Sequence, residues 1–213
     1  MSSDVLVTTP AQRQTEPHAE AVSRNRRQQA TFRKVLAAAM ATLREKSYAD
    51  LTVRLVAARA KVAPATAYTY FSSKNHLIAE VYLDLVRQVP CVTDVNVPMP
   101  IRVTSSLRHL ALVVADEPEI GAACTAALLD GGADPAVRAV RDRIGAEIHR
   151  RITSATGPGA DPGTVFALEM AFFGALVQAG SGTFTYHEIA DRLGYVVGLI
   201  LAGANEPSTG GSE

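Results

Sequence analysis

The sequence predicts an all-α protein, and three observations lead to that prediction. Apolar residues recur at spacings of three and four along most of the chain, which is the period of a helix with one buried face. Asp134-Pro135 and Asp161-Pro162 each supply a capping side chain and a first helical residue, and Gly131–Gly132 supplies a stop. The stretch from Thr52 to Lys74 has the pattern of two short helices joined by a tight turn, which is the layout of a helix-turn-helix.

The distribution of charge distinguishes the front of the chain from the rest. The 213 residues are 47% hydrophobic, enough to bury a core, and their formal net charge is zero. Residues 1–74 nevertheless hold 12 Lys and Arg against 5 Asp and Glu, a net charge of +7, so the remaining residues carry −7. A basic segment can follow a phosphate backbone, whereas an acidic body is repelled by it. The sequence therefore places any nucleic-acid-binding part at the front.

The two ends and the cysteines bear on the cellular compartment. Residues 1–23 and 205–213 are polar with few branched or aromatic apolar residues, so we expect both to be disordered. We find no secretory signal pattern and no apolar run close to membrane-span length, so we expect a cytoplasmic protein without a membrane partner. Cys91 and Cys124 lie far apart outside any ligand spacing, which favours two reduced thiols and no metal site.

A first strong helix is expected from Gln28 to Lys46, where an apolar stripe runs from Phe32 to Leu43. Just before it lies a basic cluster of Arg24, Arg26 and Arg27. This cluster is either an arm that reaches phosphates or a minor groove, or simply a solvated helix entry, and the sequence leaves both interpretations open.

The segment Thr52–Lys74 begins with Thr52 at a helix N-cap position, followed by a helix Val53–Ala60 and a turn at Lys61–Ala63. Pro64 suits the first position of the second helix. Helical spacing turns Ala67 and Phe71 inward and leaves an outer face made of Pro64, Ala65, Thr66, Tyr68 and Thr69. Thr side chains can contact base edges, and Tyr hydroxyls can bond phosphates. The alternative for this helix is a connector with solvated Thr and Tyr side chains.

The next helix is expected over Lys74–Val89, and three prolines in Pro90–Pro100 must end it. Beyond that boundary only helical patterns follow, over Ile101–Ala115, from Pro118 to Gly131, from Asp134 to about Thr153, over Gly163–Gly180 and from about His187 to Ala202.

The last two helices are apolar on more than one face, since Val165–Val177 carries one charge and Gly194–Ala202 carries none. Such helices must be covered on more than one side, and self-association through a four-helix interface would achieve this. The alternative is the deep core of a single subunit. The expected dimer-interface residues are Phe172, Ala175, Leu176, Ala179, Leu193, Val196, Val197 and Ile200.

The segment Thr52–Lys74 resembles the DNA-binding segment of TetR-family transcriptional regulators. The matching residues are Thr52, Val53, Arg54, Val56, Ala57, Ala60, Val62, Thr66, Tyr68, Tyr70, Phe71 and Lys74. Three positions depart from the family pattern. Lys61 replaces a turn glycine and must either accept a left-handed backbone or form a different turn. Ala63 replaces a capping serine, and Ala67 replaces a larger apolar residue.

The resemblance implies a three-helix DNA-binding domain over residues 24–73 and a helical ligand-binding and dimerisation domain over residues 74–204. It implies a homodimeric repressor that binds a palindromic operator in double-stranded DNA and is released by a small, largely apolar effector. The DNA contacts implied are Arg26, Arg27, Thr52, Arg54, Pro64, Ala65, Thr66, Tyr68, Thr69, Tyr70 and Lys74. The alternative function is a helical dimeric sensor or interaction protein whose DNA reader is degenerate.

Inward positions of the middle helices are the candidates for the ligand pocket, although such a stripe is also what a plain core looks like. These positions are Leu107, Leu110, Cys124, Leu128, Ile144, Ile148, Phe166, Met170 and Phe173. We find no His, Asp and Glu cluster at ligand spacing, no phosphate loop and no nucleophile motif, so neither an enzyme nor a cofactor is expected.

Overall fold

The computed structural model describes residues 15–92 and 94–204, and within them every regular element is a helix, as the sequence predicts. Side chains are described from residue 25 onward. The α-helices are α1 Thr15–Leu43, α2 Val53–Arg59, α3 Pro64–Tyr70, α4 Lys74–Gln88, α5 Met99–Ala111, α6 Pro118–Asp130, α7 Pro135–Thr156, α8 Pro162–Gly180 and α9 Tyr186–Ala204. Short 3₁₀ turns at Leu112–Val114 and Gly131–Ala133 extend α5 and α6.

Helix starts fall where the capping residues indicate. The Thr52 hydroxyl accepts a hydrogen bond from the Leu55 amide at 3.1 Å, and Asp134 and Asp161 accept bonds from the amides of Ala136 and Thr164 at 2.9 and 2.8 Å. In the last two cases a proline follows in the first helical turn, where its missing N–H costs nothing. These local signals are strong enough to set a helix boundary without help from packing.

Helix α1 differs from the prediction because it begins at Thr15, well before Gln28. The expectation of disorder through residue 23 is therefore wrong for residues 15–23, and residues 1–14 and 205–213 lie outside the described part of the chain. The stretch from Glu16 onward is rich in Ala, Glu, Arg and Gln, which favour a helix without any apolar stripe. A search for apolar periodicity misses a helical segment of that composition.

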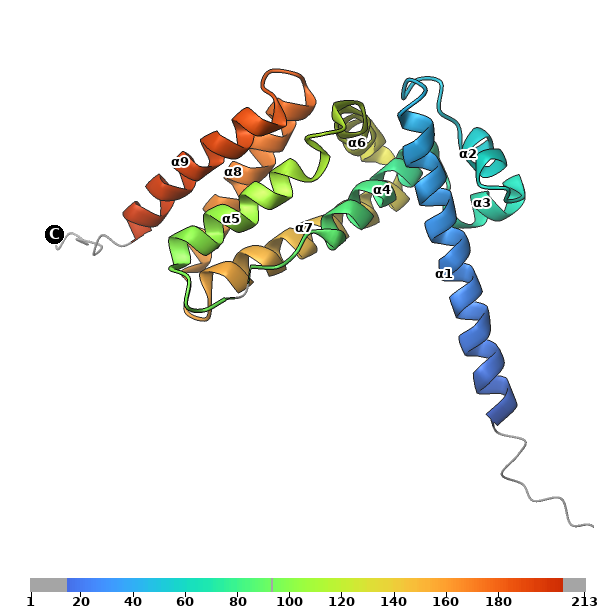
Figure 1. The fold of residues 1–213 in the computed structure, drawn as a ribbon, viewed down its shortest axis with the longest axis horizontal. Coiled ribbons are helices and arrows are strands. Elements are labelled where there is room, and N and C mark those ends of the chain that lie inside the picture. The colour runs from blue at the N-terminus through green and yellow to red at the C-terminus, as the bar shows by residue number, and fades with distance from the viewer. Residues whose placement is uncertain (1–14, 93, 205–213) are drawn as a thin grey trace, which may run out of the picture.

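Figure 1 shows two bodies joined by α4. Helices α1, α2 and α3 form the front unit, while α5, α7, α8 and α9 run alongside one another in the back unit, with α6 crossing near the junction. Helix α4 packs against α1 on one side and against α6 and α7 on the other. A single hydrophobic core runs through both units. A shift of α4 would therefore change the packing of both units.

Helix α8 corrects one expectation about apolar runs. Within the described residues, Pro162–Gly180 is long and apolar enough to cross a membrane by length and composition, with a mean hydropathy of 1.4. The core helix of a soluble protein passes the same test. Leu168 and Phe172 on α8 are fully buried inside the protein, and the helix packs against α6, α7 and α9. Length and composition are therefore weak evidence for a span here.

Candidate nucleic-acid interface and internal cavity

The helix-turn-helix has the turn that its sequence requires. Lys61 has a φ of 53°, which within the described residues is the one positive φ outside glycine. The Val62 amide then bonds the Ala57 carbonyl at 2.9 Å, which closes the end of α2. Ala63 gives α3 no side-chain cap, and Pro64 takes the first helical position instead. The left-handed lysine and the missing cap are both confirmed.

Helix α3 has one buried and one exposed face. Ala67 and Phe71 are fully buried, and the Phe71 ring stacks on Phe32 of α1 with 5.0 Å between centroids. Tyr70 is half-buried with its ring edge toward Phe32. The opposite face is exposed and consists of Pro64, Ala65, Thr66, Tyr68 and Thr69. Stacking against α1 fixes the inner face of α3 and leaves its Thr-rich face free for a partner.

The polar residues expected to contact DNA are exposed, with one exception. Thr52, Arg54, Arg26 and Arg27 are exposed on α1 and at the start of α2. The Lys74 ammonium instead donates to the Tyr48 carbonyl at 3.1 Å and lies 4.4 Å from the centre of the Tyr48 ring. Lys74 thus ties the start of α4 to the loop before α2.

Polar contacts couple α4 to the back unit. The Ser73 hydroxyl donates to Asp134 at 2.9 Å, and Arg143 of α7 donates to Glu80 of α4 at 2.6 and 3.1 Å. His76 lies 3.7 Å from the same carboxylate. Burial raises the pKa of Glu80, but the hydrogen bonds from His76 and Arg143 outweigh it and hold that pKa below its ordinary value. Glu80 is therefore the charged centre of the contact between α4 and α7.

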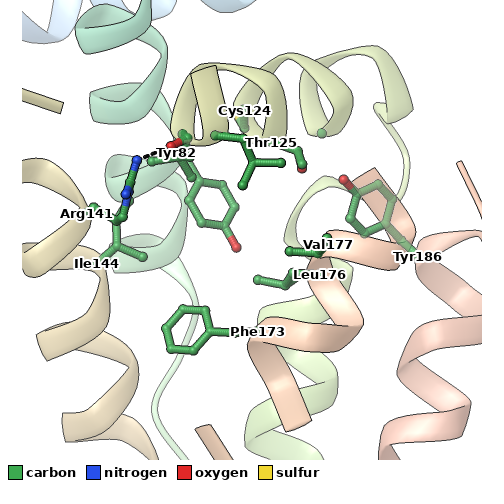
Figure 2. A pocket seen from close by; sticks show the side chains of 12 residues that line it. Tyr82, Cys124, Thr125, Arg141, Ile144, Phe173, Leu176, Val177 and Tyr186 are labelled. Carbon is green, nitrogen blue, oxygen red and sulfur yellow. Dashed lines mark hydrogen bonds between the residues drawn. The ribbon is translucent and has the colours of Figure 1, made fainter. Parts of the chain in front are cut away.

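A cavity of about 350 Å³, partly open to solvent at Leu129 and Val177, lies behind α4. Figure 2 shows its walls, with Tyr82 from α4, Thr125 from α6, Ile144 from α7 and Phe173 from α8 directed toward one space. The lining residues are Tyr82, Gly121, Cys124, Thr125, Leu128, Leu129, Arg141, Ile144, Phe173, Leu176, Val177 and Tyr186. The cavity is thus built from five helices and is bounded on one side by the junction helix.

Four of the pocket residues expected from the sequence line this cavity, namely Cys124, Leu128, Ile144 and Phe173. Three others, Leu107, Leu110 and Ile148, are fully buried in the core and do not line it. Phe166 and Met170 are also misassigned, because they are 61% and 51% exposed on the outer side of α8. Periodicity identifies a buried stripe but does not tell which part of it borders a void.

Sequence reasoning missed the aromatic walls, Tyr82 and Tyr186. Tyr82 follows Ile78 by four residues on α4, so its place on the apolar stripe was the available signal. The Tyr186 ring lies over Gly121, where an added Cβ would sit 2.5 Å from the Tyr186 hydroxyl. Only glycine lets α6 approach the start of α9 this closely.

The polar groups of the cavity are few and mostly uncharged. The Tyr82 hydroxyl is buried without a hydrogen-bond partner, and burial raises its pKa far above the ordinary value. Burial also raises the pKa of the Cys124 thiol to about 12, so it stays protonated. Arg141 is exposed and donates to the Leu128 carbonyl. The interior therefore offers hydroxyl groups, with one cation at the edge.

The outer face of α8 and α9 is apolar, but its residues are not the ones expected at a dimer interface. Phe172, Ala175, Ala179, Leu193 and Val197 are buried inside the protomer. Leu176 lines the cavity, and Val196 and Ile200 are partly exposed. The exposed apolar residues are Phe166, Met170, Val177, Tyr195 and Leu199. Because both helices are apolar nearly all round, the sequence did not indicate which stripe faces outward.

The geometry defines a class of protein, in which one helix joins a helix-turn-helix, the layout of a DNA-binding unit, to a helical unit with a partly open apolar cavity. Among the described residues no group of three or more His, Cys, Asp or Glu is placed to hold a metal ion. Residues 35–81 match the family described as bacterial regulatory proteins, tetR family. The front of the chain, over this segment, is thus similar to that family of bacterial regulatory proteins.

Solved structures resemble the chain over most of its length. A TetR transcriptional regulator from Rhodococcus sp. RHA1 is 21% identical, with 84% of this chain and 98% of that chain covered and a TM-score of 0.69. FadR of Thermus thermophilus, a TetR-family transcriptional repressor solved with lauroyl-CoA, is 18% identical over 85% and 99%, with a TM-score of 0.60. FadR of Bacillus subtilis, solved with stearoyl-CoA, is 14% identical over 81% and 98%, with a TM-score of 0.54. These likenesses confirm the shared fold of both units.

Proposed function

We propose that the protein is a homodimeric cytoplasmic repressor that binds a palindromic or near-palindromic operator and releases it when a small, largely apolar ligand enters the cavity. The observation that carries this proposal is the position of α4, which begins beside the DNA reader at Lys74 and supplies Tyr82 to the cavity wall. A ligand that binds better to one position of α4 would shift the reader with it.

The DNA contacts follow from the exposed face of α3. Ala65, Thr66 and Thr69 would face base edges in the major groove, while the hydroxyl of Tyr68 would bond a phosphate. Pro64 and Tyr70 flank this face. Arg26, Arg27, Thr52 and Arg54 would provide contacts to the backbone. Lys74 would have to leave the Tyr48 carbonyl to add another. A dimer would place two such helices about 34 Å apart, one turn of DNA, which is why we propose a palindromic operator.

Dimerisation would use the outer face of α8 and α9. Met170 and Leu199 are each more than half exposed, and an added Cβ at Gly174 or Gly198 would meet nothing within 4 Å. A soluble monomer rarely leaves several large apolar side chains together on paired helices. A second copy of the same face would cover them, as in a four-helix interface.

The apolar walls of the cavity support an apolar effector. Leu128, Ile144 and Phe173 are among the residues that line it, and its volume lies within the range of small-molecule sites. The two FadR proteins of similar fold hold acyl-CoA molecules. That likeness favours an apolar ligand for this chain as well, but it does not identify the molecule.

The proposal is tested by selecting bound fragments from random DNA and titrating the selected sequence in gel shifts at several salt concentrations. We expect an inverted repeat, tight binding and a steep loss of affinity with salt, because phosphate contacts release counterions. Weak binding without sequence preference would instead support the degenerate-reader alternative, which the uncapped α3 and the strained Lys61 motivate.

A further inference from the structure

The Tyr82 hydroxyl stands out among the buried polar groups of the protein. Among the described residues it is the one buried side-chain oxygen or nitrogen that has no hydrogen-bond partner, and the side chain is only 5% exposed. Figure 2 shows it pointing from α4 into the cavity, toward Leu176 and Val177. A buried hydroxyl without a partner destabilises the protein, so its presence needs an explanation.

We propose that the Tyr82 hydroxyl is the anchor for the effector, and that the effector is a small, neutral, mostly apolar molecule with one hydrogen-bond-accepting oxygen, such as a ketone or an ester. This inference rests on the proposed function, because it assumes that the cavity is the effector site. It goes beyond that proposal by naming the residue that binds the polar group of the ligand and the kind of polar group that the ligand carries.

The charge state of the cavity favours a neutral ligand. Burial raises the pKa of the Tyr82 phenol and of the Cys124 thiol, so both remain uncharged donors. The cation among the lining residues, Arg141, is exposed and already donates to the Leu128 carbonyl. A carboxylate buried near Tyr82 would depend for a neutralising charge on Arg141, at the exposed edge of the cavity, whereas a neutral ligand needs none.

The surroundings of Tyr82 favour a single polar group on an otherwise apolar molecule. Phe173, Leu176 and Ile144 provide hydrocarbon surface around the hydroxyl. The second phenol, Tyr186, differs because its hydroxyl interacts with Thr125. At about 350 Å³ the cavity also lies at the small end of ligand sites, which range from roughly 300 to 1,000 Å³. It suits a short apolar molecule better than a whole coenzyme.

The test compares three probes of equal chain length, 2-decanone, decanoate and decanoyl-CoA, by calorimetry on the full chain and on Tyr82→Phe. We expect 2-decanone to bind the wild type, and the variant to bind it about tenfold more weakly, because only the hydroxyl is lost. The matched control is Tyr48→Phe, which removes the same group from a phenol that lies outside the cavity and donates to Asn75, and which should leave the affinity for 2-decanone within about twofold.

Thermal melting of the ligand-free variant separates a ligand role from a structural one. Because the Tyr82 hydroxyl has no partner, Tyr82→Phe should melt at the same temperature as the wild type or higher. A lower melting temperature, or equal affinity of both proteins for 2-decanone, would overturn the inference. Binding of decanoate or decanoyl-CoA but not 2-decanone would overturn it while leaving the proposed function intact. Failure of every probe would count against both the inference and the effector site.

Discussion

Replacing Lys61 by glycine should stabilise the protein. A non-glycine residue at a φ of 53° crowds its Cβ against the following carbonyl, at a cost of about 1–2 kcal/mol. Glycine removes that cost but adds about 0.5–1 kcal/mol of backbone entropy to the unfolded chain. At the middle of these ranges the net gain is about 0.75 kcal/mol, which raises the melting temperature of a chain of this size by about 1.5–3 °C.

The contacts of Lys61 make this estimate simple. Its side chain is exposed, and the backbone bond from its amide to the Ala58 carbonyl, 3.0 Å long, does not depend on the side chain. Lys61→Gly therefore changes the backbone preference and one surface charge, and little else.

Differential scanning calorimetry of Lys61→Gly beside Lys61→Ala separates the two effects. Alanine removes the same charge but keeps the Cβ, so it should leave the melting temperature unchanged. If alanine stabilises as much as glycine, charge and not backbone strain is the cause. If glycine lowers the melting temperature, the turn does not have the left-handed geometry described above.

Three further predictions concern the reader, the outer face and the α4–α7 contact. Tyr68→Phe should weaken operator binding about fivefold on every sequence through loss of a phosphate bond, whereas Thr66→Ala should change the preferred bases, both measured by gel shift on a panel of operators. Leu199→Arg should give a monomer in sedimentation velocity, because a buried unpaired charge would disrupt the interface. The control is Ile101→Arg on α5, where the replaced side chain is similarly exposed, and it should leave the dimer intact. A dimeric Leu199→Arg variant would exclude the α8–α9 face as the interface. Glu80→Gln should lower the melting temperature at pH 7, and the difference from wild type should shrink as the pH falls below about 4.3, because a carboxylate whose pKa is depressed in the folded state stabilises above its unfolded pKa and loses that contribution on protonation. A difference that does not vary with pH would show that charge plays no part there.

The features that the sequence predicted correctly are those that local chemistry determines. Thr52 caps α2 because a hydroxyl there reaches an amide three residues on, and this holds whatever packs nearby. Pro64 begins α3 and Lys61 turns the chain for equally local reasons. The helix-turn-helix could thus be predicted almost residue by residue, including its weak points.

The start of α1 shows the limit of a search for apolar stripes. The helix begins at Thr15 with residues that prefer helix but need not be buried. Helix propensity, summed over that segment, was the signal that could have extended the prediction.

The cavity and the outer face of α8 could not be predicted because they depend on which side of a uniformly apolar helix meets which partner. Phe166 and Phe172 are equally apolar and lie about a third of a turn apart around the helix, yet the first is 61% exposed and the second fully buried. Nothing in an apolar stripe distinguishes a side that packs from one that borders a void or a second protomer.

The hydrogen bonding of Tyr82 could not be predicted from the sequence either. Its ring belongs to the apolar face of α4 and its position could be predicted, but whether its hydroxyl finds a partner depends on helices far along the chain. The missing partner of Tyr82, and not its burial, is what makes it a candidate for ligand recognition.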